Sequence, residues 1–181
     1  MVQQALHHKT ADLVGRAVAD SLEASADNLK LALRRLGGGV SIITTGQGDQ
    51  RTGATVTSAT ALSVDPPRML VSLNSSSSTW PIVRQTGTFA VNLPGNEHEI
   101  VAQNFAGFGG LAGQDRYRDA EWGRLATGAP VLLDAAAVID CEVEEVIERY
   151  SHVIVIGSVK AIRLGEGNSL IYQAGKFLHS V

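Results

Sequence analysis

The feature that most restricts the fold is a pair of long β-prone segments near the C-terminal end of the chain. Residues Ala136–Ile147 and Val153–Leu164 are rich in Val and Ile, and only the sequence ERYSH separates them. The first segment, which contains CEVEEVIER, also places apolar residues at helical spacing. A strand is the better interpretation because its partner, VIVIGSV, is strongly β-prone. Two long strands around a short turn predict an antiparallel hairpin.

Shorter β-prone runs occur along the rest of the chain, with turn signals between them. Strands are expected at Val40–Thr45, Arg51–Thr60, Arg68–Leu73, Thr88–Leu93 and Leu170–Leu178. The turn Gly46–Gln50 joins the first two of these into a hairpin, and Pro66-Pro67 introduces the third. Six or seven strands with peripheral helices predict a mainly β (α+β) fold, an antiparallel barrel rather than a series of β-α-β units.

Three helices are expected around this sheet. The first spans Asn28–Leu36 and ends at Gly37–Gly39, because glycine commonly follows a helix C-terminus. The second spans Trp80–Gln85, with Thr79 as its N-cap. The third runs from Asn96 to about Phe105, and a capping box is expected between its first residue and the Glu three positions on.

Length and charge favour one domain without affinity for nucleic acid. The chain has 181 residues, a formal net charge of -3 and no run of Lys or Arg. Its single cysteine, Cys141, allows no disulfide within the chain, which fits a reducing compartment. No apolar run approaches membrane-spanning length, so no membrane contact and a cytoplasmic location are expected. Residues 1–25 are expected to be a helical or disordered lead-in, and residues 26–181 the folded domain.

Several familiar chemistries are missing from the sequence. There is no P-loop, GxSxG, HExxH or CxxC motif, and GGGV precedes a strand rather than a helix, unlike a dinucleotide-binding fingerprint. His98 and Glu99 have no further ligand at a useful spacing, so no metal site is predicted. Cys141 alternates with Asp140 and Glu142, which predicts a small hydrophobe facing the core rather than a reactive thiol.

Hydroxyl groups are concentrated in two segments, TGATVTSATALSVDPP (Thr52–Pro67) and NSSSSTWP (Asn74–Pro81). Each has an ordinary interpretation, because Thr suits a barrel wall and a Ser-rich loop can simply cap a helix. Exposed amides and hydroxyls at a helix N-terminus also form an anion site. A short strand joins the two segments, so an antiparallel sheet would bring them together. This combination predicts a ligand with a phosphate and a polyol chain.

The order and spacing of these motifs resemble the short-chain flavin reductase family. Members are the reductase components of two-component flavin-dependent monooxygenases and have an FMN-binding split-barrel fold. The resemblance covers roughly Leu29–Leu178 and rests on GATVTSATALSVDPPRMLVSLN, SSSTWPIVRQTGTFAVNL, AQNFAG, TGAPVLLDAAAVIDCEVEEVIERYSHVIVIGSV and LIYQAGKF. It implies a homodimer that binds FMN or FAD, reduces it with NADH or NADPH, and delivers the reduced flavin to a separate monooxygenase.

The resemblance also implies a set of cofactor-binding residues. They are Gly39, Thr55, Val56, Thr57, Ser58, Ala61, Leu62, Ser63, Asn74, Ser75, Ser77, Ser78, Thr79, Asn104, Phe105, Ser151 and Tyr172. The TVTS strand and the ALS turn would line the flavin ring and its ribityl chain, and the Ser-rich loop would hold the phosphate. The AQNFAG segment would close over the flavin. His152 would lie near the nicotinamide, where it donates a hydrogen bond and excludes water; by itself it would be an ordinary turn residue.

Hydride transfer on a flavin needs no acid, base or nucleophile from the protein, because the flavin carries the redox chemistry. Two other functions remain open at this level. One is a flavin- or heme-binding split-barrel carrier or sensor without turnover, which would not need His152 or Gly37–Gly39. The other resembles a pyridoxamine-phosphate oxidase, but Arg51, Arg68 and Arg84 are scattered rather than clustered as a phosphate clamp.

Overall fold

The computed structural model describes residues 20–179, and contacts divide the chain into two units, residues 1–33 and 34–181. In the described part of the first unit, helix α2 (Ala26–Leu33) begins where the Ser25 hydroxyl accepts a hydrogen bond from the Asn28 amide. The helix therefore starts before the predicted Asn28 and ends before the predicted Leu36. Most of the predicted lead-in, residues 1–25, lies outside the described residues, and the domain boundary stays a prediction.

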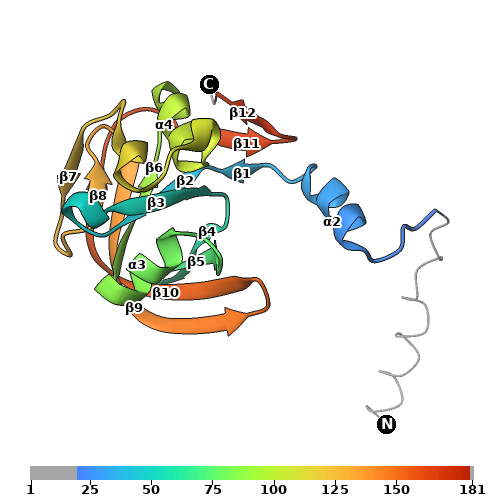
Figure 1. The fold of residues 1–181 in the computed structure, drawn as a ribbon, viewed down its shortest axis with the longest axis horizontal. Coiled ribbons are helices and arrows are strands. Elements are labelled where there is room, and N and C mark those ends of the chain that lie inside the picture. Colours follow the sequence, from blue (N-terminus) through green and yellow to red (C-terminus); the bar gives the residue numbers. More distant parts are fainter. Residues whose placement is uncertain (1–19, 180–181) are drawn as a thin grey trace, which may run out of the picture. The chain divides into compact units, whose positions relative to one another are not determined.

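The second unit is built on one seven-stranded antiparallel sheet and two smaller sheets (Figure 1). The spatial order of the large sheet is β3 (Thr52–Val56), β2 (Ser41–Thr45), β6 (Thr88–Leu93), β9 (Ala137–Arg149), β10 (His152–Leu164), β5 (Pro67–Asn74) and β4 (Ala59–Val64). The smaller sheets pair β1 (Gly38–Gly39) with β11 (Ile171–Gln173) and β12 (Lys176–Leu178), and β7 (Trp122–Arg124) with β8 (Pro130–Leu132). The expected mainly β fold with peripheral helices is confirmed.

The long C-terminal hairpin is present as predicted. β9 and β10 are antiparallel along their length, from His152 opposite Arg149 to Leu164 opposite Ala137. The helical alternative for CEVEEVIER is therefore wrong. A strand forms there because β9 lies between β6 and β10, so its backbone groups have partners on both sides.

Two predicted strands are each divided in the structure. Arg51–Thr60 becomes β3 and β4, which form opposite edges of the large sheet, and the chain crosses between them through Thr57 and Ser58. Because β3 pairs only with β2 and β4 only with β5, the hydroxyl-rich segment bends instead of running straight. Leu170–Leu178 becomes the hairpin of β11 and β12, with a turn at Ala174-Gly175.

Helix α3 (Thr79–Thr86) ends at Gly87 and starts one residue before the predicted Trp80. The prediction of Thr79 as its N-cap is wrong. Thr79 is the first helical residue, and the Ser77 hydroxyl instead accepts the hydrogen bond from the Trp80 amide at 3.3 Å.

Helix α4 (Glu99–Phe105) follows a 3₁₀ turn at Asn96–His98. The predicted capping box between Asn96 and Glu99 is wrong. The Gly95 amide donates to Nδ1 of His98 at 3.1 Å, and the His98 amide donates to the Gly95 carbonyl at 3.0 Å. The imidazole of His98 is buried and its Nε2 lies 2.9 Å from Oδ1 of Asp134, so this side chain fastens the helix start to the loop before β9.

Strand β2 is buried on both faces, because successive side chains point to opposite sides of a sheet. Ile43 packs inside the barrel with Leu73, Phe89 and Val155, whereas Ile42 packs with Phe105 under α4. Cys141 is buried in the first of these clusters, as predicted, and burial raises the pKa of its thiol to about 12.

A buried polar network joins three strands across the same core. The side-chain amide of Asn92 donates to the Ile42 carbonyl and to the Thr44 hydroxyl, both at 2.9 Å. Its carbonyl oxygen accepts from the Leu132 amide at 2.8 Å, and the Thr44 hydroxyl donates to the Pro130 carbonyl. Asn92 therefore fixes β8 against β2 and β6 with no exposed polar atom.

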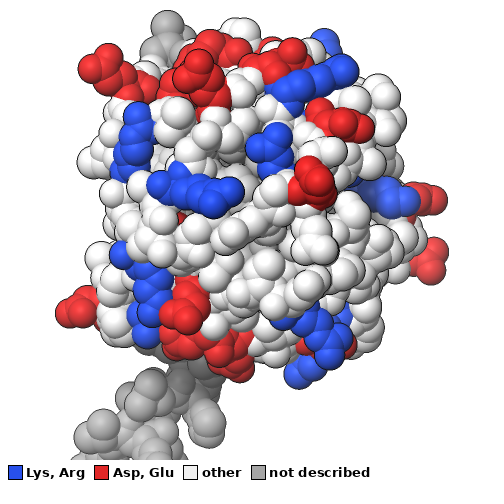
Figure 2. Space-filling view, turned by 60° about the vertical axis from the view of Figure 1, so that its left-hand side comes forward, with Lys and Arg blue, Asp and Glu red and all other residues white. Residues whose placement is uncertain are grey.

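Acidic and basic side chains are interspersed on the face shown in Figure 2, rather than gathered into a patch of one sign. Within residues 20–179, no helix is long and apolar enough to cross a membrane. The same residues contain no cluster of His, Cys, Asp and Glu suited to a metal ion.

Candidate functional site

The Ser-rich loop before α3 is held in shape by its first residue. Oδ1 of Asn74 accepts hydrogen bonds from the Ser76 amide at 2.9 Å and from the Ser76 hydroxyl at 2.8 Å. The Ser77 amide donates to the Asn74 carbonyl at 3.0 Å. This turn directs the loop into the N-terminus of α3, where the Ser78 side chain makes no capping hydrogen bond. Helix amides and the partial positive charge of the helix end favour an anion at this position.

One buried hydroxyl at this helix start has no partner. The Oγ1 atom of Thr79 is fully buried and forms no hydrogen bond within the described protein. Because this atom has no accessible surface, a ligand bound from outside does not reach it in this conformation. The exposed residues of the loop are Asn74, Ser75, Ser76 and Ser78, and it is their amides and hydroxyls that fit the phosphate end of a flavin.

The Ser151-His152 turn lies beside the Ser-rich loop. His152 is directly opposite Asn74 in the pairing of β10 with β5. The Ser75 amide and the Ser75 hydroxyl both donate to the Ser151 carbonyl at 3.0 Å. Nδ1 of His152 lies 2.9 Å from the Ser151 hydroxyl, so this contact orients the exposed imidazole. The structure thus brings together two segments that are far apart in sequence, since Ser75 and Ser151 are separated by 76 positions.

The bend between β3 and β4 contacts β5, the strand before the Ser-rich loop, and also borders a pocket. The Ser58 hydroxyl donates to the Ser72 carbonyl at 2.7 Å, and the Ser72 amide donates back to the Ser58 carbonyl at 3.4 Å. Ser72 lies two residues before Asn74 on β5, a separation of about 7 Å along a strand. Thr57 precedes Ser58 and lines the pocket.

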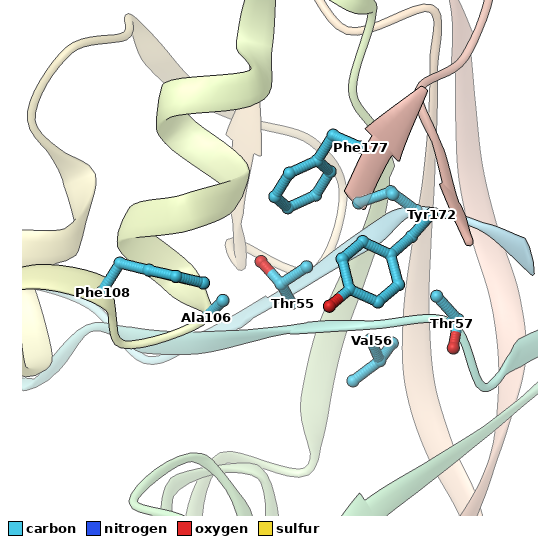
Figure 3. Close-up of a pocket in the computed structure, with 8 residues that line it drawn as sticks. Thr55, Val56, Thr57, Ala106, Phe108, Tyr172 and Phe177 are labelled. Carbon is cyan, nitrogen blue, oxygen red and sulfur yellow. The ribbon is translucent and has the colours of Figure 1, made fainter. Parts of the chain in front are cut away.

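The pocket has a volume of about 230 Å³ and is mainly apolar. Its lining residues are Val40, Thr55, Val56, Thr57, Ala106, Phe108, Tyr172 and Phe177. Figure 3 shows Phe108 on one side of Thr55, with Tyr172 and Phe177 on the other. The rings of Tyr172 and Phe177 pack edge to face, 5.1 Å between centroids. The Thr55 hydroxyl donates to the Ala102 carbonyl at 2.6 Å, so it already has an acceptor.

We call the pocket, the Thr57–Ser58 bend and the Ser-rich loop together the strip: Thr57 lines the pocket, and Ser58 is hydrogen-bonded to Ser72, two residues before Asn74. Of the predicted flavin-contacting residues, Thr55, Val56 and Thr57 line the pocket with Tyr172, and Gly39 lies in β1 beside Ile171 of the same hairpin. Ala61, Leu62 and Ser63 lie on β4 next to β5, with Leu62 half exposed.

Asn104 and Phe105 were also predicted to contact the flavin, but both side chains pack against other parts of the protein. Asn104 is buried and its side-chain amide donates to Asp119 at 3.0 Å. Phe105 is 2 % exposed and packs against Tyr117 and Trp122, with ring centroids 4.9 and 5.4 Å away. Neither is among the lining residues of the pocket, and their flavin-binding roles stay predictions.

Two aromatic residues that were not among the predicted cofactor-binding residues also line the pocket, Phe108 and, from β12, Phe177. Ala106 lines it too and belongs to the AQNFAG segment that was expected to close over the flavin. The sequence feature that could have identified Phe108 is an aromatic residue inside a Gly-rich loop, AGFGG, since a large apolar side chain is unfavourable in a fully solvated loop.

The edge strand β3 is closed to further pairing by two side chains. The Tyr117 hydroxyl donates to the Thr52 carbonyl at 2.6 Å, and the Arg116 guanidinium donates to the Gly53 carbonyl and, at 3.1 Å, to the Leu111 carbonyl. Burial raises the pKa of the Tyr117 phenol above its usual range and lowers the pKa of Arg116. These bonds fix the segment after the pocket to β3 and hold one wall of the strip in place.

The fold defines the class of protein, an antiparallel split barrel, with the apolar pocket at one end of the strip and the Ser-rich loop at the other. Residues 33–179 match the family profile described as "Flavin reductase like domain". The chain therefore belongs to the flavin reductase-like family.

Curated relatives and solved structures agree with this assignment. The chain is 34% identical over 158 residues to "FMN reductase (NADH) RutF 2" of Methylorubrum extorquens, an alignment that covers 87% of this chain and 91% of that protein. It is 31% identical over 147 residues to the "4-hydroxyphenylacetate 3-monooxygenase reductase component" of Salmonella typhi, covering 81% and 86%. The solved structure of flavin reductase PheA2 superposes with a TM-score of 0.78 at 26% identity, covering 87% of this chain and 99% of that one.

Proposed function

We propose that the protein is an NADH-dependent flavin reductase that transfers hydride from a nicotinamide to FMN or FAD. The observation that carries the proposal is the Ser-rich loop at the start of α3, which lies beside the Ser151-His152 turn, with His152 opposite Asn74. Membership of the flavin reductase-like family supports it, as do relatives named as NADH-dependent FMN reductases.

The residues of the chain bind and position the flavin rather than react with it. The flavin, when bound, supplies the hydride-accepting ring. The loop Asn74–Thr79 would hold the phosphate with the amides and hydroxyls of the α3 N-terminus. Thr57 and Ser58 would accompany the polyol chain, and the apolar pocket would exclude water from the ring. Holding the flavin ring against the nicotinamide would lower the activation free energy of hydride transfer mainly by orienting the two rings.

His152 would orient the nicotinamide. Its Nδ1 is held by the Ser151 hydroxyl, which leaves Nε2 for the carboxamide of the second substrate. The proposal assigns His152 a positioning role rather than that of a general acid. Substitution by Ala should therefore raise the KM for NADH without weakening flavin binding.

The protein is further proposed to act as a homodimer that supplies a separate monooxygenase in the cytoplasm. Two of its relatives are the reductase components of a 4-hydroxyphenylacetate 3-monooxygenase and of a two-component tryptophan halogenase. A pocket of about 230 Å³ is smaller than the roughly 300–1,000 Å³ of ligand pockets in general. Self-association through the apolar side chains exposed on β4 and β10, Val64 and Leu164 among them, would enclose more of the ligand. Light scattering tests this: twice the mass of one chain is expected.

The deciding measurement is loss of NADH absorbance by the purified protein in air, with and without micromolar FMN or FAD. Oxidation that rises and saturates with one flavin is expected, and NADPH in place of NADH reports the nicotinamide preference. The His152→Ala variant should show the raised KM for NADH. Flavin binding without oxidation of either nicotinamide would refute the reductase proposal and favour a flavin carrier.

A further inference from the structure

Tyr150, at the tip of the β9–β10 hairpin, has an aromatic side chain that no other part of the described protein covers. All Trp, Tyr and Phe residues of the chain lie within residues 20–179. Among them Tyr150 is the only one that is fully exposed, and the next most exposed, Phe108, is 60% exposed. A ring without protein contacts adds no packing energy to the fold. Packing therefore does not account for an aromatic residue at this position.

The backbone conformation of Tyr150 is unfavourable for a tyrosine. Arg149 lies directly opposite His152, so Tyr150 and Ser151 form a two-residue hairpin turn. Such turns require a positive φ at their first residue, where Gly, Asn or Asp is preferred. Tyr150 has a φ of 52°, which is rare for a residue with a bulky side chain. The turn therefore holds a tyrosine where glycine would be more stable, and strain of this kind is typical of ligand-binding positions.

The turn is fixed against the Ser-rich loop. The Ser151 carbonyl accepts hydrogen bonds from the amide and the hydroxyl of Ser75, both at 3.0 Å. Consecutive Cα atoms are about 3.8 Å apart, so Tyr150 is next to a residue that contacts the loop directly. His152, on the other side of Ser151, is opposite Asn74. The exposed ring of Tyr150 thus belongs to the edge of the site proposed for the flavin phosphate and the nicotinamide.

The chemistry of this edge matches the adenine of a dinucleotide. FAD and NADH both carry adenosine beyond a diphosphate, and FMN and reduced nicotinamide mononucleotide lack it. Adenine is a flat aromatic base that stacks on the face of a tyrosine ring, and such stacking needs no enclosed pocket. A phosphate or a sugar gains little from the same face, so the phosphate is left to the amides and hydroxyls of the loop.

We propose that Tyr150 stacks on the adenine of a dinucleotide bound at the Ser-rich loop and His152. Its role is to discriminate FAD from FMN, or NADH from the shorter nicotinamide, through a part of the ligand that takes no part in hydride transfer. This assignment rests on the proposed function for the places of the flavin phosphate and the nicotinamide. Tyr150 lies outside every segment that the hydroxyl-rich motifs define.

The test compares each dinucleotide with its adenine-free counterpart, using the full-length protein. Calorimetric titration gives the affinities for FAD and FMN, and steady-state kinetics give the KM for NADH and for reduced nicotinamide mononucleotide. Tyr150→Gly should weaken FAD about tenfold with FMN unchanged, or raise the KM for NADH about tenfold with the mononucleotide unchanged. The pair that changes identifies which dinucleotide supplies the adenine. Tyr150→Phe keeps the ring and should behave as the wild type in both pairs.

Ala174 provides a matched control for the backbone. It has a φ of 53° in the turn of the β11–β12 hairpin. Glycine relieves the positive φ at either position, so Tyr150→Gly and Ala174→Gly should each raise the Tm by about 2–4 °C. Only Tyr150→Gly should change the binding of a dinucleotide. A gain in stability that accompanies a loss of affinity is not expected from a residue with a purely structural role.

Unchanged FAD affinity together with an unchanged KM for NADH in Tyr150→Gly would overturn the inference. A loss shared equally by FMN and the mononucleotide would also overturn it, and so would a lower Tm. Light scattering of Tyr150→Gly covers the remaining case, because a reduced mass would assign the ring to a contact between two copies of the chain instead. The proposed function fails separately: a wild-type protein that oxidises no NADH with any flavin refutes the reductase, and the comparison of FAD with FMN still tests Tyr150.

Discussion

Replacing Asn92 by Ala tests the buried polar network that joins β2, β6 and β8. The substitution removes three hydrogen bonds, to the Ile42 carbonyl, the Thr44 hydroxyl and the Leu132 amide. Asn92 is 0% exposed, so no bulk water replaces these partners.

The expected cost follows from counting these groups. Each of the two bonds donated by Asn92 contributes about 0.5–1.5 kcal/mol, and leaving the buried Leu132 amide unsatisfied costs about 1–3 kcal/mol. The sum is about 4 kcal/mol. Since the free energy of unfolding of a domain is about 5–15 kcal/mol, such a loss is a large share of the total.

Urea denaturation measures this loss through tryptophan fluorescence, because Trp80 is buried and Trp122 packs against the aromatic cluster. With a slope of about 2 kcal/mol per molar urea, the midpoint should fall by about 2 M. The exposed amide Gln85 on α3 is the matched control, and Gln85→Ala should change stability by less than about 0.5 kcal/mol.

A double-mutant cycle with Thr44→Val measures the coupling between Asn92 and Thr44, for which about 1 kcal/mol is expected. A loss below about 1 kcal/mol in Asn92→Ala, equal to that of Gln85→Ala, would refute the reasoning. It would mean that the network is satisfied without the amide.

Three further outcomes are expected. The raised pKa of Cys141 means that its proton stabilises the folded state: the contribution of this thiol to stability should be constant below about pH 9 and fall as pH rises toward 12, and Cys141→Val should make the alkaline loss of stability shallower by up to about 1.4 kcal/mol per pH unit in urea denaturation. Arg116→Met should lower the free energy of unfolding by about 2 kcal/mol, because the Gly53 and Leu111 carbonyls lose a charged donor; thermal unfolding checks this, and an unchanged Tm would contradict it. Thr79→Val should leave or raise the Tm, because the Thr79 hydroxyl is buried without a protein partner, and it should leave FMN affinity unchanged in a titration, because the hydroxyl does not reach the surface; a lower Tm would contradict this expectation.

The strands that the sequence predicted best have partners on both sides. β6 begins and ends at the predicted residues Thr88 and Leu93, and the β9–β10 hairpin was predicted despite the helical spacing within CEVEEVIER. Inside a sheet, apolar β-branched residues and backbone pairing favour the same conformation, so local sequence and tertiary structure agree.

The division of Arg51–Thr60 was not predictable from composition. Thr57 is β-prone and Ser58 alone is only a weak turn signal, and the bend there arises from closure of the barrel, which sets β3 and β4 on opposite edges. The error at Thr79 was not predictable from local sequence either. Thr79 looks like an N-cap in sequence, but it follows a turn that the hydrogen bonds of Asn74 determine.

Four residues that the resemblance named as flavin contacts, Thr55, Val56, Thr57 and Tyr172, line the pocket, and their flavin-binding roles stay predictions. Phe108 and Phe177 were missed because they come from segments distant in sequence that only the folded chain brings to Thr55. Phe105 packs in the core against Tyr117 and Trp122, and its predicted flavin contact stays a prediction.

The crossing at Thr57 and Ser58 has a consequence for how long a ligand stays bound. β3 and β4 are opposite edges of the sheet and do not pair with each other, so the barrel is closed there by the covalent chain through Thr57 and Ser58, while the two Ser58–Ser72 hydrogen bonds continue the β4–β5 ladder. Widening this crossing disturbs few bonds, whereas separating β9 from β10 breaks many. We therefore expect residence time and resistance to unfolding to vary independently: substitutions at the crossing should change the rate at which reduced flavin leaves while amide hydrogen exchange in the long hairpin stays slow.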